Sequence, residues 1–303
     1  MDLAIIAGQG GLPPHLVRVL LAKGEVPLIC EIEQFPSDLG NELPSLSFRL
    51  ETCGTFLNEL KSRGVTRLCM AGAVRRPDVD PSLIDAATMP LVPKVMAAMA
   101  KGDDGTLRIL VDLIESQGIQ VIGASDIDPD LLPDVGAFTD LEPYDGIAGD
   151  ISAAQSALDK MAAKDLGQAV VARNGRVIAQ ETDKGTDAML RDLQGGGEPS
   201  GDAFDLIGEA LDDVADWLGG PVAEAARATE DNGGILYKAP KPGQELRVDM
   251  PVIGPGTVQG AVKAGLDGIV ISSRGVMVLE QDKVRQLLQE HALFLWVHDG
   301  AAT

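Results

Sequence analysis

The fold is decided near the start of the 303-residue chain, by Leu3-Ala4-Ile5-Ile6-Ala7-Gly8-Gln9-Gly10-Gly11-Leu12-Pro13. The apolar run Leu3–Ala7 predicts a buried strand, and Pro13 is typical of the first turn of a helix, which we expect over 13–23. Glycines at such a junction let the main chain approach a ligand closely, and the start of the helix attracts phosphate. We therefore expect Gly10, Gly11 and Leu12 to contact a nucleotide, with a plain tight turn as the alternative.

Short apolar runs and segments of helical period continue to alternate after this stretch. Alternation of this kind predicts a parallel sheet with crossover helices, and hence an α/β fold with a Rossmann-like domain over residues 1–145. The further strands are expected at 26–32, 46–50, 67–74 and 120–122, and the further helices at 55–63 and across 90–116 with a break at 101–104.

The second half follows a stretch rich in Asp, Pro and Gly, 125–149, in which we place the domain boundary. Asn174-Gly175 lies between the apolar runs 169–173 and 176–180 and predicts a β-hairpin. Helices at 150–164, from Thr186 and at 203–218, followed by mixed strand and helix with a second hairpin-like turn at Arg274-Gly275, complete a mixed α/β domain over 146–303.

The predicted helix at 203–218 is acidic and has one apolar face. We expect this face to pack on its own domain or on a neighbouring subunit in a homodimer, because helices that bind membrane surfaces are usually basic.

Bulk composition excludes several classes of protein. A formal charge of −21 opposes binding to nucleic acid. No apolar run is long enough to span a membrane, and the acid at Asp2 is unlike a signal peptide. Cys30, Cys53 and Cys69 lack the spacing of metal ligands, which fits buried thiols in a reducing compartment. We expect a cytoplasmic protein.

A basic loop stands out in this acidic chain, at Lys238-Ala239-Pro240-Lys241-Pro242-Gly243-Gln244-Glu245-Leu246-Arg247-Val248-Asp249-Met250-Pro251. Prolines stiffen it, and cations held in place suit a diphosphate. Asp249 lies beside the cations, where a carboxylate is able to hold Mg²⁺ or orient an attacking water. A surface pair of Arg247 with Asp249 is the alternative.

Two further segments are candidates for the site. Gly72, Ala73 and Val74 end a predicted strand at the carboxyl edge of the sheet, where ligands bind in open α/β folds, and Arg75-Arg76 follows them. Thr186 and Asp187 follow the hairpin, and their alternative role is to cap a helix. Capping is also the favoured role of Asp103.

The chain resembles the LpxI-type UDP-2,3-diacylglucosamine pyrophosphatases, through a set of motifs that spans both halves in order. The motifs are Ala7-Gly8-x-Gly10-x-Leu12-Pro13, Ala71-Gly72-x-Val74-x-Arg76-Pro77, Lys101-Gly102-Asp103-Asp104, Gly185-Thr186-Asp187, Lys238-Ala239-Pro240-Lys241-Pro242 and Arg247-x-Asp249-x-Pro251-x-Ile253-Gly254.

The resemblance implies a Mg²⁺-dependent hydrolase of lipid A synthesis, with a C-terminal domain peculiar to the family and the substrate held between the two domains. Its products would be UMP and 2,3-diacylglucosamine 1-phosphate, formed by attack of water on the phosphorus nearer the sugar. A soluble enzyme of this kind would take its acylated substrate from the inner-membrane surface.

Site roles follow for the matching positions. Asp249 is expected to be essential and to bind the metal, with Asp187 as its partner ligand. We expect Lys238, Lys241 and Arg247 to stabilise the charge on the leaving phosphate. The substrate-binding residues would be Gly10, Gly11, Leu12, Gly72, Ala73, Val74, Thr186, Asp187 and Gln244.

The sequence departs from the usual family pattern in three places. Lys184 stands where an acid is usual, Val252 replaces a threonine, and the region 195–233 is long. The first weakens a metal role near Asp187, and the second removes a possible phosphate donor.

Two other functions remain open from the residues alone. A dinucleotide-dependent oxidoreductase would use Glu31 to bind a ribose, although Pro13 stands where the dinucleotide fingerprint has glycine. A nucleotide-sugar sensor without turnover would keep the same fold and the same motifs.

Overall fold

The computed structural model describes residues 1–40, 42–74, 78–99, 103–164, 166–194 and 233–300. The chain forms two compact units, one of residues 1–132 and 243–250 and the other of residues 133–242 and 251–303. The chain first passes from one unit to the other between Leu132 and Pro133. This point lies within the stretch rich in Asp, Pro and Gly, and it precedes the boundary predicted at 145/146. The basic loop is divided, because its segment 243–250 belongs to the N-terminal unit.

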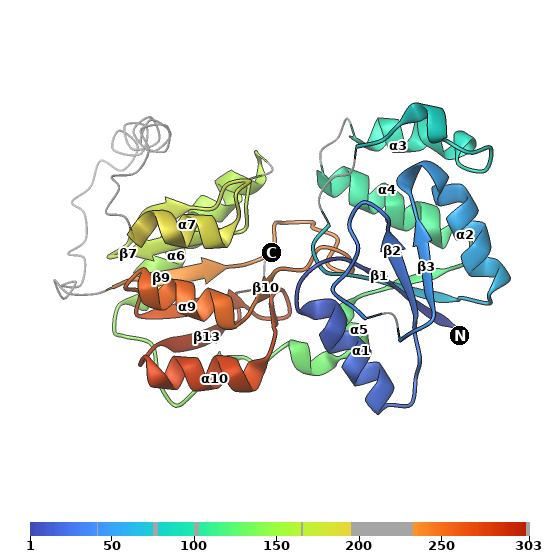
Figure 1. Cartoon of the computed structure of the whole chain (residues 1–303). Coiled ribbons are helices and arrows are strands. Elements are labelled where there is room, and N and C mark those ends of the chain that lie inside the picture. Colours follow the sequence, from blue (N-terminus) through green and yellow to red (C-terminus); the bar gives the residue numbers. More distant parts are fainter. Residues whose placement is uncertain (41, 75–77, 100–102, 165, 195–232, 301–303) are drawn as a thin grey trace. The chain divides into compact units, whose positions relative to one another are not determined.

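The N-terminal unit contains a five-stranded parallel sheet in the order β3-β2-β1-β4-β5 (Figure 1). This doubly wound order confirms the predicted Rossmann-like α/β fold. The strands are β1 (Leu3–Ala7), β2 (Leu28–Ile32), β3 (Ser45–Phe48), β4 (Arg67–Ala71) and β5 (Gln120–Ile122).

Successive strand residues point to opposite faces of the sheet, and both faces are apolar. Helices therefore pack on the sheet and bury these side chains. One buried cluster joins Ala4, Leu28 and Leu68 to residues of α2 (Cys53–Ser62) and α4 (Asp103–Glu115). The remaining helices are α1 (Leu12–Ala22), α3 (Val92–Met99), which packs beside α4, and the short α5 (Ala124–Ile127), which contacts α1. Short 3-10 helices occupy Leu50–Thr52, Pro81–Leu83, Met89–Leu91 and Pro129–Leu131.

The C-terminal unit is built on a six-stranded mixed sheet in the order β6-β13-β11-β9-β7-β8. The central strands β9, β11 and β13 are parallel, and the outer strands run antiparallel to their neighbours. The strands are β6 (Gly136–Ala137), β7 (Ala169–Arg173), β8 (Arg176–Gln180), β9 (Ile235–Lys238), β11 (Gly268–Ser272) and β13 (Phe294–His298).

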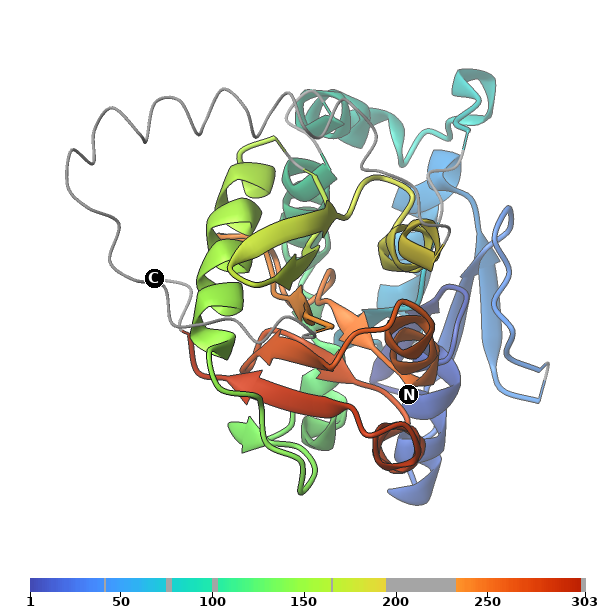
Figure 2. The same cartoon turned by 90° about the vertical axis from the view of Figure 1, so that its left-hand side faces the viewer.

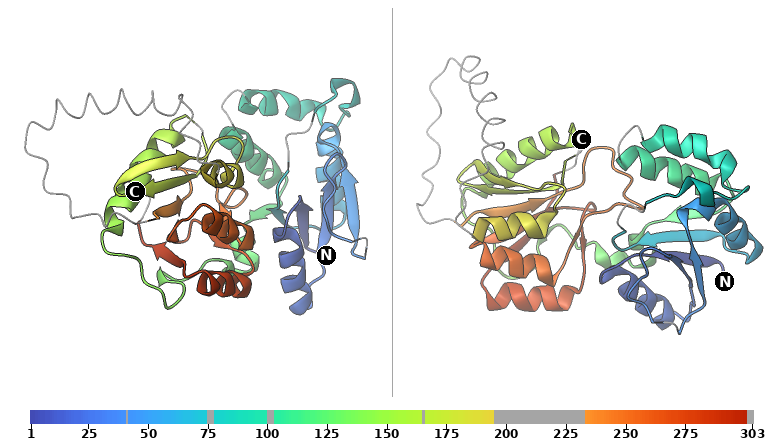
Figure 3. Two further views of the ribbon diagram at one scale, coloured as in Figure 1. Left: turned by 60° about the vertical axis from the view of Figure 1, so that its left-hand side comes forward. Right: turned by 45° about the horizontal axis from the view of Figure 1, so that its top comes forward.

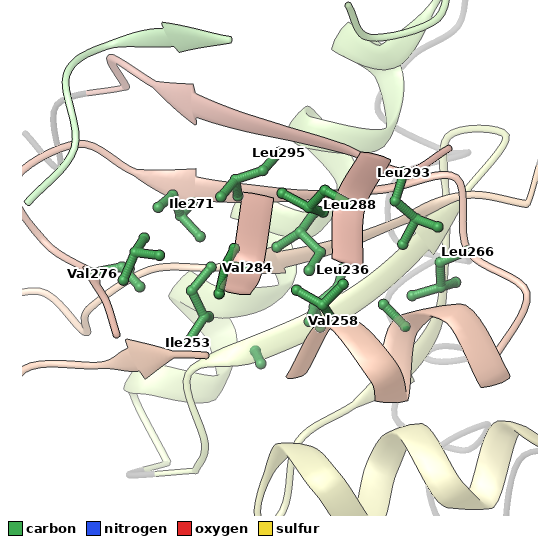
Figure 4. Packing of buried hydrophobic residues seen from close by; sticks show 14 of the residues in the cluster. Leu236, Ile253, Val258, Leu266, Ile271, Val276, Val284, Leu288, Leu293 and Leu295 are labelled. Atoms are coloured by element: carbon green, nitrogen blue, oxygen red, sulfur yellow. The ribbon is translucent and has the colours of Figure 1, made fainter. Parts of the chain in front are cut away.

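This second sheet is covered on both faces (Figure 2). On one face, α6 (Ile147–Ala162) packs on Val170, Tyr237 and Val270. The other face carries the larger cluster, shown in Figure 4, to which the strands contribute Leu236, Ile271 and Leu295. The helices that cover it are α7 (Thr186–Gln194), α9 (Pro255–Lys263) and α10 (Gln281–Glu290), and α9 and α10 lie side by side in Figure 3.

The two predicted turns have different outcomes. The Asn174-Gly175 hairpin is confirmed: β7 and β8 pair antiparallel across it, and both residues have positive φ, 52° and 71°. The prediction of a hairpin at Arg274-Gly275 is wrong, because the strands on the two sides of this turn belong to different sheets. The strand before it, β11, is in the six-stranded sheet, and the strand after it, β12 (Met277–Val278), pairs with β10 (Val252–Ile253) in a two-stranded sheet. Both edges of β11 are already paired with β9 and β13, so no hairpin partner fits there.

Several predictions lie outside the described residues, namely the helix at 203–218 and the pairs Arg75-Arg76 and Lys101-Gly102. Within the described part of the chain, no helix is both long enough and apolar enough to cross a membrane. Cys30 and Cys69 are buried and Cys53 is half-buried, and all three are free thiols.

Candidate active site

The turns after β1 and β4 are joined by their backbones. Gln9 and Ala73 exchange two hydrogen bonds, each with an N···O distance of 2.9 Å, and the Gly8 amide donates to Ala71 O at 2.8 Å. These contacts bring the predicted ligand residues Gly10 and Gly11 close to Gly72 and Ala73. They lie at the carboxyl edge of the sheet, at the point between β1 and β4 where the strand order reverses, which is where doubly wound folds bind ligands.

Glycine is required at this junction because the backbones approach closely. A Cβ atom at Gly8 would lie 2.6 Å from Ala73 O, and one at Gly72 would lie 2.8 Å from Gln9 O. Gly72 and Gly10 also have φ of 90° and 100°. Leu12 begins α1 and is buried, so its side chain supports the turn, whereas Gly10, Gly11, Gly72, Ala73 and Val74 are exposed.

The loop 243–250 lies at the same edge, beside β5. The Arg247 guanidinium donates to Val121 O at 3.4 Å, and the Arg247 backbone passes close to Gly123. Arg108 from α4 donates to Gly243 O at 2.6 Å, and Val248 packs against the buried cluster of the N-terminal unit. The Arg-x-Asp motif is therefore fixed to the N-terminal unit by contacts with residues far earlier in the chain.

Arg247 binds two carboxylates. It makes a bidentate pair with Glu245, with both N···O distances 2.8 Å, and a further contact of 2.8 Å with Glu115 of α4. The hydrogen bonds that Arg247 donates to Glu245 raise the pKa of Arg247, and the same contact lowers the pKa of Glu245. The alternative surface pair with Asp249 is not what the structure shows, and Arg247 instead anchors the loop to α4.

Asp249 is oriented by Gln244. The buried Gln244 side chain donates from Nε2 to Asp249 Oδ2 at 2.6 Å and to Asp249 O at 2.5 Å. The Asp249 amide donates to Glu245 O at 3.0 Å, which closes a turn around the residue. This arrangement holds a half-buried carboxylate in a fixed direction at the sheet edge, and it gives Gln244 a positioning contact beyond the substrate-binding role predicted for it.

A second group of predicted residues lies in the C-terminal unit. Lys238 ends β9 and is only 7% exposed. Its ammonium donates to Thr186 Oγ1 and to Val252 O, each at 3.1 Å. Val252 contributes its backbone carbonyl here, so the absence of the usual threonine side chain leaves this contact in place.

Glu181 completes this group and was missed by the sequence reasoning. Thr186 donates its hydroxyl proton to Glu181 Oε1 at 2.7 Å, and the Gln168 amide donates to Glu181 Oε2 at 2.7 Å. Burial lowers the pKa of Lys238, while the negative charges of Glu181 and Asp187 oppose that shift. The sequence offered one signal for it, because Glu181 is an acid that lies five positions before Thr186, shortly before the Gly185-Thr186-Asp187 motif.

The remaining predicted residues of this unit are less enclosed. Asp187 is exposed in the first turn of α7, and Lys241 is half-buried in the segment after β9. The structure thus sorts the predicted site into two groups. Lys238, Lys241, Thr186 and Asp187 belong to the C-terminal unit, and the glycine turns with Gln244, Arg247 and Asp249 belong to the N-terminal unit.

Glu31 does not stand ready to bind a ribose. Its Oε1 accepts hydrogen bonds from the Ser37 amide at 2.9 Å and from the Ser37 hydroxyl at 2.5 Å, within the loop that follows β2. This carboxylate therefore orders its own loop, which weakens the oxidoreductase alternative.

Comparison with known proteins agrees with the motifs. The sequence profile of the LpxI N-terminal domain matches residues 2–131, and that of the LpxI C-terminal domain matches residues 134–204 and 217–296. A Caulobacter vibrioides protein named UDP-2,3-diacylglucosamine pyrophosphatase LpxI is 31% identical over 293 residues, which are 97% of this chain and 96% of that protein. The gap in the C-terminal match falls inside the region 195–233 that looked long from the sequence. The family prediction is confirmed, and this chain belongs to the LpxI family.

Proposed function

We propose that this chain hydrolyses the pyrophosphate bond of UDP-2,3-diacylglucosamine, giving UMP and 2,3-diacylglucosamine 1-phosphate in lipid A biosynthesis. The observation that carries the proposal is a match over 97% of the chain to a protein named for that substrate. The geometry supports it, because each unit holds a group of residues suited to part of the substrate.

The N-terminal unit suits the nucleotide. The exposed glycine turn precedes α1 and is joined to the turn after β4, which places it beside the helix start, where a phosphate is favoured. The loop 243–250 adds the oriented carboxylate of Asp249 at the same sheet edge.

Mg²⁺ fits the carboxylates available in the chain. Asp249 and Asp187 offer the hard oxygen ligands that Mg²⁺ prefers. Among the described residues, no cluster of three or more His, Cys, Asp and Glu forms a complete metal site. Mg²⁺ commonly uses one or two carboxylates and fills its shell with water and substrate phosphates, and the oriented carboxylate of Asp249 suits that role. When bound, the ion would withdraw charge from the diphosphate oxygens.

The protein groups then have separate tasks. Asp249, held by Gln244, orients the attacking water and receives its proton, while water attacks the phosphorus nearer the sugar and UMP leaves. Lys238 and Lys241 stabilise the charge that develops on the phosphates. Arg247, which already binds two acids, contributes mainly by keeping Asp249 in place.

The substrate carries two acyl chains, which would be held in a bilayer. We therefore propose that the protein works in the cytoplasm as a peripheral protein that contacts the inner-membrane surface for the time of the reaction.

The test is incubation of the pure protein with UDP-2,3-diacylglucosamine and Mg²⁺, with mass-spectrometric detection of both products. Formation of UMP and 2,3-diacylglucosamine 1-phosphate in equal amounts supports the proposal. Tight substrate binding without turnover would favour the sensor, and stabilisation by NAD(P) in a thermal-shift assay would favour the oxidoreductase.

A further inference from the structure

A buried chain of hydrogen bonds connects Lys238 to an acid that no motif singled out. The order is Lys238 Nζ to Thr186 Oγ1 at 3.1 Å, then Thr186 Oγ1 to Glu181 Oε1 at 2.7 Å. All three side chains are less than 9% exposed, and all three belong to the C-terminal unit.

The chemistry of threonine gives this chain a direction. A hydroxyl has one proton to donate, and it accepts through its lone pairs. An ammonium only donates and a carboxylate only accepts, so Thr186 must accept from Lys238 and give its proton to Glu181. The Gln168 amide, at 2.7 Å from Oε2, fixes the other oxygen of Glu181. The carboxylate therefore takes the Thr186 proton, and the lone pairs of the hydroxyl face the ammonium.

The charge of Lys238 also needs compensation. The residue is almost fully buried, and its ammonium contacts the first residue of α7, where the helix dipole is positive. A cation in such a place is unfavourable unless an acid lies near it. The acids whose charge reaches it are the buried Glu181 and the exposed Asp187.

We propose that Glu181 is a positioning residue, which through Thr186 directs the Lys238 ammonium so that its third N–H meets a phosphate oxygen of the substrate. Within the described residues, the acceptors of the other two N–H groups are Thr186 Oγ1 and Val252 O. The inference rests on the proposed function for the identity of the ligand, while the ordering of Lys238 exists without substrate.

Three variants separate this role from a general loss of stability. Thr186→Val keeps the size of the side chain and removes the hydroxyl, whereas Thr186→Ser keeps the hydroxyl and removes a methyl group. Glu181→Gln keeps the shape of the side chain but leaves it a single oxygen. When that oxygen accepts from the Gln168 amide, the NH₂ group faces Thr186, and the Thr186 hydroxyl loses its acceptor. Thr88→Val is the matched control, because Thr88 is buried in the N-terminal unit and its hydroxyl accepts from the Gly54 amide at 2.9 Å.

We expect Thr186→Val and Glu181→Gln to lower kcat by about ten- to a hundredfold with little change in KM, because a misdirected catalytic cation has an effect of that size. Thr186→Ser, which keeps the hydroxyl, should retain at least half of the wild-type kcat. Thr88→Val should lower the melting temperature and leave kcat unchanged. Wild-type kcat in Thr186→Val or Glu181→Gln, or a loss in Thr186→Ser as large as that in Thr186→Val, would overturn the proposal.

A spectroscopic measurement makes the outcome independent of turnover. A buried, ordered lysine ammonium exchanges its protons slowly enough to give a resolved ¹H–¹⁵N signal, which Lys238→Met would assign. That signal should be present in the wild type and in Thr186→Ser and absent in Thr186→Val. If the wild type shows the signal and hydrolyses nothing, the proposed function fails and the ordering of Lys238 stands. If the signal persists in Thr186→Val, the positioning role is wrong even when the enzyme is active.

Discussion

Replacement of Gln244 by methionine is the perturbation that most directly probes the local geometry of the site. Methionine has a similar length and is tolerated in buried places, but it donates no hydrogen bond. The change removes the 2.6 Å contact to Asp249 Oδ2 and the 2.5 Å contact to Asp249 O. The loop 243–250 keeps its other anchors, through Arg247 and Val248.

The expected size of the effect follows from those two contacts. A hydrogen bond to a carboxylate contributes about 1.5–3 kcal/mol and one to a neutral carbonyl about 1 kcal/mol. Asp249 is half-buried, so water replaces part of this, and about 1.5–2.5 kcal/mol of orientation remains. Because each 1.4 kcal/mol is a factor of ten, kcat should fall by about ten- to a hundredfold.

The assay is a kinetic double-mutant cycle with Asp249→Asn, alongside thermal denaturation to verify that each variant folds. If Gln244 acts through Asp249, its replacement should have almost no further effect on kcat in the Asp249→Asn background. Losses that simply add would show that Gln244 does not act through Asp249, and wild-type kcat in the Gln244→Met single variant would show that its contacts with Asp249 do not matter for turnover.

Other predictions test the fold and the proposed cofactor. Gly8→Ala should lower the free energy of unfolding by about 1–3 kcal/mol, since the added Cβ meets Ala73 O at 2.6 Å. Gly256→Ala in α9 is the control and should not lower it, because the space around this glycine is open. Urea denaturation of both variants measures the two free energies. Burial raises the pKa of Cys30 and Cys69 to about 12 from an ordinary value of 9.0, so the folded protein keeps protons that the unfolded chain loses. The stabilisation from this difference should be complete below pH 9 and vanish as the pH rises through 12. Ellman's reagent at pH 8 should label both thiols only after denaturation. Labelling of both thiols in the native protein would contradict their burial. EDTA should stop hydrolysis and Mg²⁺ should restore it, with full turnover in EDTA as the contrary result.

The strands of the N-terminal unit could be predicted closely because apolar runs stood between glycines and prolines. The predicted ends were wrong where local geometry overrides the pattern. The strand expected over 67–74 ends at Ala71, since Gly72 turns the chain with a φ of 90°. The strand expected from residue 26 begins at Leu28, directly after Pro27, which has no N–H to donate to a neighbouring strand.

The candidate site was predictable as a set of motifs but not as an arrangement. Nothing in the spacing of the basic loop indicates that its segment 243–250 folds onto the N-terminal unit, because the contacts of Arg247 with Glu115 and Val121 join residues more than 120 positions apart. Glu181 was missed for a related reason. Its importance comes from burial next to Lys238 and Thr186, which a local pattern does not encode.

The role of Asp249 is tested by measuring hydrolysis of UDP-2,3-diacylglucosamine by Asp249→Ala and Asp249→Asn beside the wild type, with substrate binding determined separately. We expect a loss of kcat of about a thousandfold in both variants, with binding changed far less, because orientation of water and acceptance of its proton depend on this carboxylate. Turnover within tenfold of the wild type in either variant would contradict the placement of the reaction at Asp249.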